Sequence, residues 1–429
     1  MLFRSVIGDK NGRSPKFFEL YSGGQSTNRD AWVYSSSYSS SAEKVQRLIE
    51  YYSIAVSAYR RSSAGRNFKE WLKANPEYAN PKKIKWTDLL YKSAEKNRVI
   101  EFDSKNQSIA LYRPFFKQVN YRSRELIHRE YKMREILPGN RQTNAGFVVV
   151  SPGESVELSA LATNVIPDLH TIASCQFFPR FTWEPVDAGD GGLFGAVNVG
   201  EQGEASMYGQ VGEVVDGYVR VDNVTDEIKS IYRSGLGEDI SGDDIFHFVY
   251  GKLHDPEYRE MYAADLKKML PHIETPSSRE EFDKFASAGA ELMALHVGYD
   301  DLEPYPLDIQ VKGDENDRET WRVVKPKCAK KKDPETGKNI NDVTKMIYNK
   351  NVTIAGIPAE ADEYMLGSRS ALAWIIDRYQ ISTDKKGKSG IVNDPNDWAD
   401  EVGNPRYIVD LIGKVTTVAV ETMKIVKAL

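Results

Sequence analysis

Residues 393–396, Asn-Asp-Pro-Asn, come nearest in this sequence to a known catalytic signature. Amino-methyltransferases grip a base with Asn-Pro-Pro-aromatic, because oxygen atoms accept the exocyclic amino protons while the aromatic ring stacks on the flipped base. Here the second proline is missing and Trp398 is displaced. No convincing glycine-rich turn follows a hydrophobic strand to hold a cofactor. We therefore interpret Asn393, Asp394 and Pro395 as parts of a structural turn.

Three further segments resemble a phosphate-binding or metal-binding motif but lack part of its pattern. The Gly-Lys-Ser of residues 387–389 matches the end of a phosphate-binding loop, but Ser382 stands where the first glycine should be. The acidic residues within 333–338 lack the apolar strand that would fix a metal-binding carboxylate pair. His247 and His254 fall two turns apart on one expected helix, without a third metal ligand nearby. The sequence therefore predicts no catalytic residue, no metal site and no cofactor.

Two other segments combine positive charge with features that suit nucleic acid. Residues 112–141 carry eight Lys/Arg against three Glu, interleaved with five aromatic residues. Residues 325–338 carry six Lys against one Asp and one Glu. Lysine and arginine can neutralise phosphates while tyrosine and phenylalanine stack or pack. The residues that we predict to bind DNA are Tyr112, Arg113, Lys117, Tyr121, Arg122, Arg124, Arg322, Lys325, Lys327, Lys330, Lys331 and Lys332.

Each of these segments also has a plainer interpretation. The first could be a solvated face of a β-rich unit, and Arg113 could be buried in an ion pair that holds this unit together. The second could be a solvated loop tip, because its lysines are too densely charged for a packed interior. If the second segment reaches DNA, we expect it to supply affinity more than sequence choice, since phosphate contacts position a protein without reading bases.

Length and composition place the chain among soluble globular proteins. Its 429 residues are too many for one ordinary core and should divide into two or three compact units. No apolar run approaches the roughly 18 residues of a membrane span, and no secretory signal opens the sequence, so we expect a cytoplasmic protein without a membrane partner. Cys175 and Cys328 cannot form a disulfide framework or a thiolate zinc site. The net charge of -5 argues against a generally cationic coat.

The spacing of apolar residues predicts where the helices lie. Apolar side chains recur at helical spacing in the ranges 42–75, 243–270, 278–299, 370–380 and 407–429.

Shorter runs of β-type residues predict the rest of the fold. Such runs, separated by Gly, Pro and Asn, indicate a β-rich module between 100 and 240. Within it we expect the glycine-rich stretch 187–206 to be a mobile surface loop. The Lys-rich segment 325–338 is expected to be a loop, and 343–356 a strand. The predicted class is mixed α+β, with helical segments before and after the β-rich module.

Five stretches of the sequence occur in the order in which one known family carries them. They are GGQSTNRDAWVYSSS at 23–37, LYRPFFKQVNY at 111–121, IPDLHTIASCQFFPRFTW at 166–183, IFHFVYGKLHDPEYREMY at 245–262, and the stretch 354–398 that begins IAGIPAEADEYMLG and ends IVNDPNDW. Over nearly its whole length, the sequence therefore resembles the C-terminal part of the single-chain type ISP restriction-modification enzymes. These are large helicase-methyltransferase proteins.

This resemblance implies a DNA target-recognition module without its catalytic partners. In that family a nuclease, a helicase, a coupler and an adenine methyltransferase precede the target-recognition domain. The implied partners are double-stranded DNA and the methyltransferase and helicase/nuclease domains of the same system. In such systems the recognition domain contacts base edges in the major groove while the methyltransferase extrudes the target adenine.

The resemblance also implies a division of the chain and some structural residues. Residues 1–110 would be a mostly helical segment that follows the methyltransferase core, 111–240 the β-rich DNA-recognition part, and 241–429 a helical and mixed α/β part that completes the domain. We assign structural roles to Trp32, Trp374 and Arg378. The glycine-rich insert and the Lys-rich loop have no place that we can identify in the family pattern.

Two alternative functions remain at this point. A protein-interaction scaffold would explain the acidic balance and the aromatic content without DNA. A remnant of a DNA methyltransferase that acts with a separate catalytic chain would explain the resemblance without an independent role. Salt-dependent binding of DNA separates the scaffold from the DNA reader.

Overall fold

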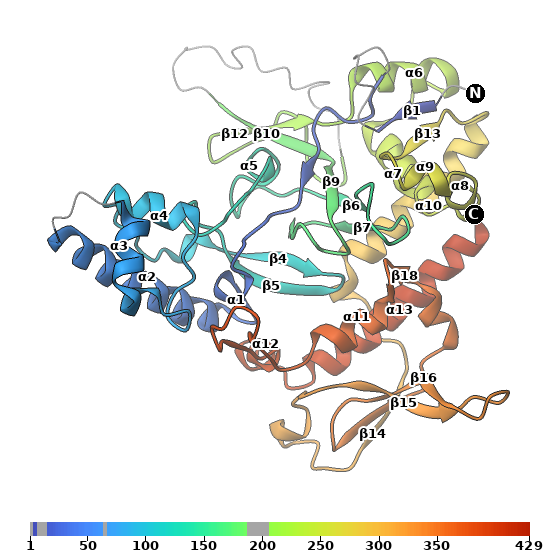
Figure 1. Ribbon diagram of the computed structural model, residues 1–429. Coiled ribbons are helices and arrows are strands. Elements are labelled where there is room, and N and C mark those ends of the chain that lie inside the picture. Colours follow the sequence, from blue (N-terminus) through green and yellow to red (C-terminus); the bar gives the residue numbers. More distant parts are fainter. Residues whose placement is uncertain (1–2, 7–14, 63–66, 187–205) are drawn as a thin grey trace.

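Helices and small sheets alternate along the chain in the computed structural model, which describes residues 3–6, 15–62, 67–186 and 206–429 (Figure 1). This arrangement confirms the mixed α+β class. The glycine-rich segment 187–206, expected to be a mobile loop, lies outside the described residues except for Ser206. Within those ranges, none of the helices combines the length and the apolar character that a membrane span requires.

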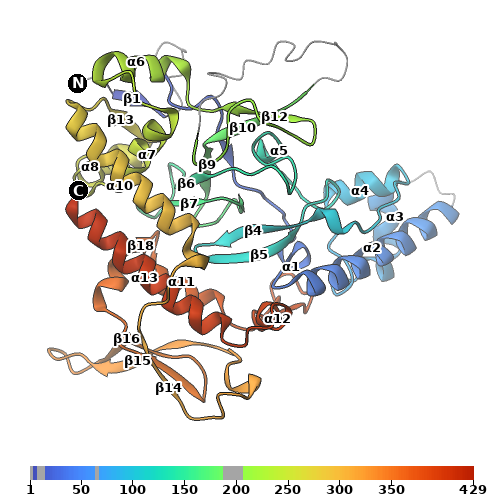
Figure 2. The ribbon, with the colours of Figure 1, turned by 180° about the vertical axis from the view of Figure 1, so that it is seen from behind.

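The first helices form one end of the molecule in both views (Figure 1, Figure 2). They are α1 (Asp30–Val33), α2 (Tyr38–Arg61), α3 (Phe68–Ala74) and α4 (Asp88–Glu95). Ser37 caps α2 by accepting a hydrogen bond from the backbone N–H of Ser40. The expectation of one helix over 42–75 is wrong. Asn67 caps a second helix by accepting from the backbone N–H of Glu70.

Three small sheets occupy the centre of the molecule and account for the β-rich module (Figure 1). The first has the order β3 (Tyr34–Ser35), β5 (Phe116–Tyr121), β4 (Gln107–Arg113), β8 (Ile166–Pro167). The second has the order β2 (Ser22–Gly23), β9 (Cys175–Pro179), β6 (Gly146–Val150), β7 (Ala160–Thr163). The third has the order β10 (Phe181–Pro185), β12 (Tyr218–Asp222), β11 (Val214–Val215). Neighbouring strands are antiparallel, apart from the parallel pair β4 and β8.

A helical layer packs beside these sheets. It contains α6 (Asp226–Leu236), α7 (Gly242–Lys252), α8 (Pro256–Met261), α9 (Ala263–Leu266) and α10 (Arg279–Val297), with a small sheet of β1 (Phe3–Ser5) and β13 (His272–Glu274). The short helix α5 (Met133–Ile136) lies instead against β10 of the third sheet. Helices α7 and α10 approach closely because each has glycine at the contact. A Cβ atom on Gly251 would collide with the carbonyl oxygen of Phe285, and one on Gly289 with that of His247.

The C-terminal region adds a separate sheet and the longest apolar helix (Figure 2). The sheet has the order β14 (Asp308–Val311), β17 (Val352–Ala355), β16 (Asn339–Ile347), β15 (Lys327–Lys332). After it come β18 (Met365–Leu366), β19 (Arg369–Ser370), α11 (Ala371–Arg378), β20 (Ser382–Thr383), β21 (Val392–Asn393), α12 (Asn396–Glu401) and α13 (Tyr407–Ala428). Short 3-10 helices lie at Pro76–Ala79, Ser104–Asn106, Tyr299–Asp301, Arg318–Thr320 and Ala359–Glu363.

The Lys-rich segment forms a hairpin and not the expected loop. Strand β15 pairs with β16 from Lys327 opposite Ile347 to Lys332 opposite Asn339, with an irregularity after Cys328. Because β15 has a partner on one side only, its lysines lie on an edge strand. The single strand expected over 343–356 is also wrong, because a turn at residues 348–351 separates β16 from β17.

The clusters of buried side chains include residues from all three parts into which we divided the sequence. One cluster of buried apolar residues extends from Trp32 in α1 through Leu111 in β4 to Val420 in α13. A second cluster joins Phe147 of β6 to Phe246 of α7. The division at residues 110 and 240 stays a prediction about roles, because the packing joins all three parts.

Trp374 lies inside this packing rather than on the surface. Ser370 caps α11 by accepting from the backbone N–H of Ala373, which directs the tryptophan inward. Its indole Nε1 donates to the carbonyl oxygen of Leu366 at 2.9 Å. The guanidinium groups of Arg369 and Arg378 lie 4.8 and 5.6 Å from the ring centre. These contacts support our interpretation of Trp374 and Arg378 as architectural residues.

Candidate nucleic-acid interface

Several residues of the first predicted DNA-binding segment are buried. Arg113 forms an ion pair with Asp168 at 2.9 Å, and Arg122 forms one with Glu130 at 2.8 Å. Tyr121 and Arg122 are buried, and Arg113 is largely covered, with 13% of its side chain exposed. These three side chains therefore form no exposed surface, and the ion pair given above as the alternative for Arg113 is present. Their role as DNA contacts stays a prediction. Strands β4 and β5 lie inside the fold, so their positive charges need carboxylate partners.

The other members of that segment divide between packed and exposed positions. Lys117 forms an ion pair with Asp300 at 2.6 Å, and Tyr112 donates to Asp30 at 3.1 Å. Both side chains therefore make contacts that hold the fold together. Arg124 is exposed, and its role as a DNA contact stays a prediction.

Arg322, which precedes the second segment, holds two parts of the chain together. Its guanidinium contacts Asp394 at 2.9 Å and Asp400 at 3.1 Å, which ties the end of the C-terminal sheet to α12. Asp394 also accepts from the backbone N–H of Asn396, so Asp394 and Pro395 form the turn that leads into α12. Asn393, which was expected in this turn, ends strand β21 instead. A DNA-binding role for Arg322 would require these ion pairs to break.

The remaining lysines of the second segment are exposed. Lys325, Lys327 and Lys332 have no hydrogen bond or ion pair from the side chain among the described residues, whereas Lys330 contacts Asn341 and Lys331 contacts Asp342. Lysine on an edge strand has a second explanation, because it discourages pairing with another chain. DNA binding by this hairpin stays a prediction.

A different set of lysines is brought together by the fold alone. We call it the paired lysine loops: residues 82–85, Lys-Lys-Ile-Lys, and residues 385–388, Lys-Lys-Gly-Lys. All six lysines are exposed, and no ion pair involves them within the part of the chain that the structure describes. Each motif could have been noticed in the sequence as a short Lys-Lys-X-Lys run. Their proximity could not, because 300 residues separate them.

Two cavities show that these loops are neighbours. Lys82 and Lys83 line a cavity of about 660 Å³ together with residues 389–393. Lys85 lines a second cavity, of about 920 Å³, together with Lys386. Trp32 borders both cavities, so the two lysine loops flank one continuous region of the molecule.

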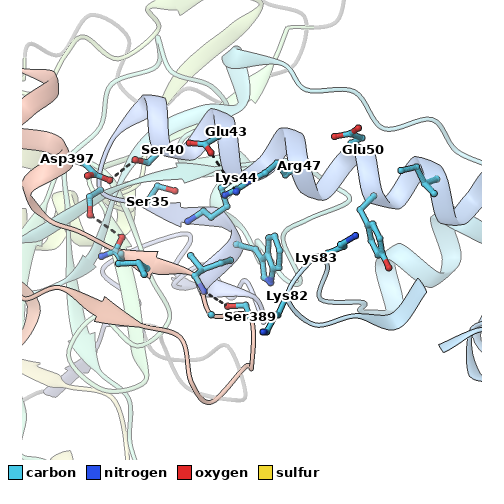
Figure 3. Close-up of a pocket in the computed structure, with 18 residues that line it drawn as sticks. Ser35, Ser40, Glu43, Lys44, Arg47, Glu50, Lys82, Lys83, Ser389 and Asp397 are labelled. Atoms are coloured by element: carbon cyan, nitrogen blue, oxygen red, sulfur yellow. Dashed lines mark hydrogen bonds and ion pairs between the residues drawn. The ribbon is translucent and has the colours of Figure 1, made fainter. Parts of the chain in front are cut away.

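Helix α2 forms one wall of the first cavity (Figure 3). Figure 3 shows Ser40, Lys44 and Arg47 along this helix, with Lys82 and Lys83 on the opposite side. Two of the three carboxylates that line this cavity, Glu43 and Asp397 but not Glu50, have partners given by the structure. Asp397 accepts from the Ser40 hydroxyl at 2.6 Å, and Glu43 lies 3.6 Å from Arg47.

The second cavity has the same balance of paired acids and unpaired bases. Asp384 accepts hydrogen bonds from the backbone N–H of Gly387 and the hydroxyl of Ser389. Burial raises the pKa of Asp168, an effect that Arg113 opposes through its ion pair. The exposed lysines of the two loops add positive charge beside these carboxylates, and a cluster of exposed lysines suits a polyanion.

Lys44 is the buried basic residue of the first cavity. Its side chain is 6% exposed, and Nζ donates to the carbonyl oxygen of Tyr34 at 2.5 Å. Burial lowers the pKa of Lys44 to about 7. Arg47 adds to this effect and Asp397 opposes it. The ammonium form is therefore costly to keep in the folded protein.

We expect Lys44→Met to change how stability depends on pH. As the pH falls from about 10.5 to about 7, the unfolded chain binds the Lys44 proton before the folded protein does, so the wild type loses stability. The methionine variant lacks this loss. The free energy of unfolding of the variant minus that of the wild type should rise across this window by roughly 4–5 kcal/mol, because each pKa unit is worth about 1.4 kcal/mol.

Urea unfolding at a series of pH values measures this difference. Lys96→Met, at an exposed lysine, is the matched control and should follow the wild-type profile. Parallel profiles for the Lys44 variant and the wild type would show that the ammonium is not penalised by burial.

Comparisons with known proteins agree with this geometry. A family model described as the type ISP C-terminal specificity domain matches residues 16–411. No curated protein sequence matches the chain.

Solved structures resemble the chain over its full length. A nuclease-deletion mutant of the type ISP restriction-modification enzyme LlaGI, in complex with a DNA substrate mimic, has a TM-score of 0.76 and 29% identity, over 100% of this chain and 34% of that chain. The ATP-dependent type ISP enzyme LlaBIII bound to DNA has a TM-score of 0.77 and 27% identity, over 100% and 24%. A DrdV-DNA complex has a TM-score of 0.73 and 26% identity, over 99% and 37%. This chain thus spans between a quarter and two fifths of those proteins.

Proposed function

The chain belongs to the family of type ISP C-terminal specificity domains, and on that premise we propose that it recognises a DNA target for a type ISP-like restriction-modification system. In this proposal it binds duplex DNA in the cytoplasm for an adenine methyltransferase and a helicase-nuclease, and it performs no catalysis itself. Residues 111–240 take the main part in recognition.

One observation carries the proposal. The chain is similar over its whole length to parts of enzymes whose structures contain DNA, and it presents six exposed lysines without carboxylate partners on two neighbouring loops. A protein with net charge -5 needs such a local positive surface to bind a polyanion. A scaffold for other proteins would not require it.

A selection of bound duplexes from a random library tests this function. The purified chain should enrich one sequence, and its affinity for the enriched duplex should fall steeply as salt increases. The selection is repeated with a type ISP methyltransferase as partner, which should sharpen the preference. A folded chain with no salt-dependent affinity for any duplex would favour the scaffold.

The β15–β16 hairpin gives a prediction about affinity without sequence choice. Replacing Lys325, Lys327 and Lys332 by Gln should weaken binding to the enriched duplex and to random duplexes equally, by roughly tenfold at about 0.1 M salt. Substitution is preferable to deletion, because the backbone of β15 pairs with β16.

Fluorescence anisotropy with both duplexes measures the two affinities. The matched control replaces the exposed Lys267 and Lys268 of the helical layer by Gln and should leave both affinities unchanged. A hairpin variant that keeps its affinity for random DNA but loses the preference would make the hairpin the sequence reader.

A further inference from the structure

Arg29 is a buried cation that forms no ion pair with the described part of the chain. It lies at the start of α1, and its side chain is 2% exposed. One nitrogen, Nη2, donates to the hydroxyl of Thr87, the residue before α4. The other two nitrogens, Nε and Nη1, have no hydrogen-bond partner among the described residues.

Such an arrangement is costly unless a ligand completes it. A buried charge without a partner destabilises the folded state by several kcal/mol, so buried charges are normally paired. Burial lowers the pKa of Arg29 to about 10, and the guanidinium therefore stays charged at neutral pH. No carboxylate contributes to that pKa. Within the described residues Arg29 thus has no anion, and an external anion would satisfy its free nitrogens.

The surroundings of Arg29 suit an anion of considerable size. Arg29 lines the cavity of about 920 Å³, together with Lys85, Lys386, His128 and His170. Lys85 and Lys386 add positive charge, and Asp30, Asp168 and Asp384 also line the cavity. This is the cavity that the two lysine loops share.

The acidic residues of the cavity do not serve as partners of Arg29. Asp30 accepts hydrogen bonds from Thr27 and Tyr112. The carboxylates of Asp168 and Asp384 are held by the contacts described above. The three carboxylates of this cavity thus have other hydrogen-bond or ion-pair partners, and none of them forms an ion pair with Arg29 in the part of the chain that the structure describes.

We propose that Arg29 binds a phosphate group of the DNA backbone, which enters this cavity between Lys85 and Lys386. The proposal rests on the proposed function, because it needs duplex DNA at the paired lysine loops. A planar guanidinium matches the geometry of phosphate oxygens, and Thr87 fixes its orientation in advance. In DNA bound by the lysine loops, backbone phosphates would lie next to this cavity.

Arg29→Met tests the site, because it keeps the length of the side chain and removes the charge. The variant should be at least as stable as the wild type without DNA, since it removes an unpaired buried charge. Its affinity for duplex DNA should fall about tenfold at about 0.1 M salt, and the salt slope should fall by roughly 0.9, as expected for one phosphate. Lys268→Gln, at an exposed lysine, is the control and should change neither quantity.

Inorganic phosphate provides a second readout that does not depend on DNA binding. At constant ionic strength, phosphate in place of chloride should raise the Tm of the wild type and not that of Arg29→Met. If the wild type binds no duplex, the proposed function is wrong and DNA is not the ligand of Arg29. Stabilisation by phosphate would still show an anion site at Arg29 in that case.

Two results would overturn the assignment directly. Unchanged duplex affinity in a folded Arg29→Met protein would show that no DNA phosphate reaches the cavity. If that variant also loses the rise in Tm caused by inorganic phosphate, Arg29 is a site for free phosphate. If Arg29→Met does not fold, Arg29→Lys replaces it, because it keeps the charge without the planar donor group. For Arg29→Lys, a lower duplex affinity with an unchanged salt slope supports the proposal, whereas an unchanged duplex affinity contradicts it.

Discussion

Replacement of the six lysines of the paired lysine loops by Gln should lower the affinity for any duplex by about 10²–10³-fold at about 0.1 M salt. The salt slope should fall by roughly 2.7, because about 0.9 is lost for each phosphate contact and we expect at least half of the lysines to make one. The residues are Lys82, Lys83, Lys85, Lys385, Lys386 and Lys388. They are exposed, so their replacement should leave the stability unchanged.

The physical reason is the absence of competition for these charges. An ammonium group that already forms an ion pair must give up that partner to bind a phosphate, whereas an exposed lysine releases only counterions. The contrast with Lys117 is direct, because that residue forms an ion pair with Asp300. Lys117→Gln should therefore change DNA affinity less than replacement of any one lysine loop.

A variant with the same net charge distinguishes local contacts from general attraction. Its six replacements by Gln are at exposed, unpaired lysines elsewhere: Lys92, Lys96, Lys105, Lys268, Lys312 and Lys350. Anisotropy titrations at several salt concentrations compare the two variants. Equal losses of affinity would mean that the chain attracts DNA by its overall charge and that the paired lysine loops are not the interface.

The sequence predicts helices well where each buries one apolar stripe. In α10, for example, Phe282, Phe285 and Leu292 are buried on one face, and this periodicity is visible in the sequence. Strand β15 has no such signal. Most of its side chains are exposed lysines, which favour no strand, and it forms because its backbone pairs with β16. Composition alone therefore suggested a loop.

The candidate site was harder to predict than the fold. A local excess of arginine and lysine cannot show whether each charge is exposed or paired, because the partner can be distant in the sequence. Asp168 lies 55 residues from Arg113, and Asp300 lies 183 residues from Lys117. The paired lysine loops present the opposite case, in which two short motifs become one surface only after folding. The family resemblance supplied the function, and it did not identify these residues.

A buried ion-pair network joins the third central sheet to the helical layer, and it should be the most sensitive charged site for stability. Arg180 is 0% exposed and contacts Asp222 of β12 and Asp243 of α7, the latter at 2.7 Å. Lys229 of α6 also contacts Asp222, at 3.2 Å. A Cβ atom on Gly242 would collide with the guanidinium, so the backbone leaves space for this side chain.

We expect Arg180→Met to lower the free energy of unfolding by about 3–5 kcal/mol, because it leaves buried carboxylates without their main partner. Urea unfolding measures the change. Arg141→Met is the matched control, since Arg141 also contacts an aspartate, Asp216, at 2.8 Å but its side chain is 75% exposed. That variant should cost at most about 1 kcal/mol, because solvent screens an exposed ion pair.

A double-mutant cycle then separates the lost attraction from the cost of the stranded carboxylate. If Arg180 and Asp222 act as a pair, Asp222→Asn in the Arg180→Met background should cost much less than Asp222→Asn in the wild type, by on the order of 1–3 kcal/mol. Additive effects would mean that Lys229 and Asp243 carry the network without this pair. In that case the attachment of α7 to the central sheets would depend on apolar packing, such as that of Phe147 of β6 in the second sheet against Phe246, and not on buried charge.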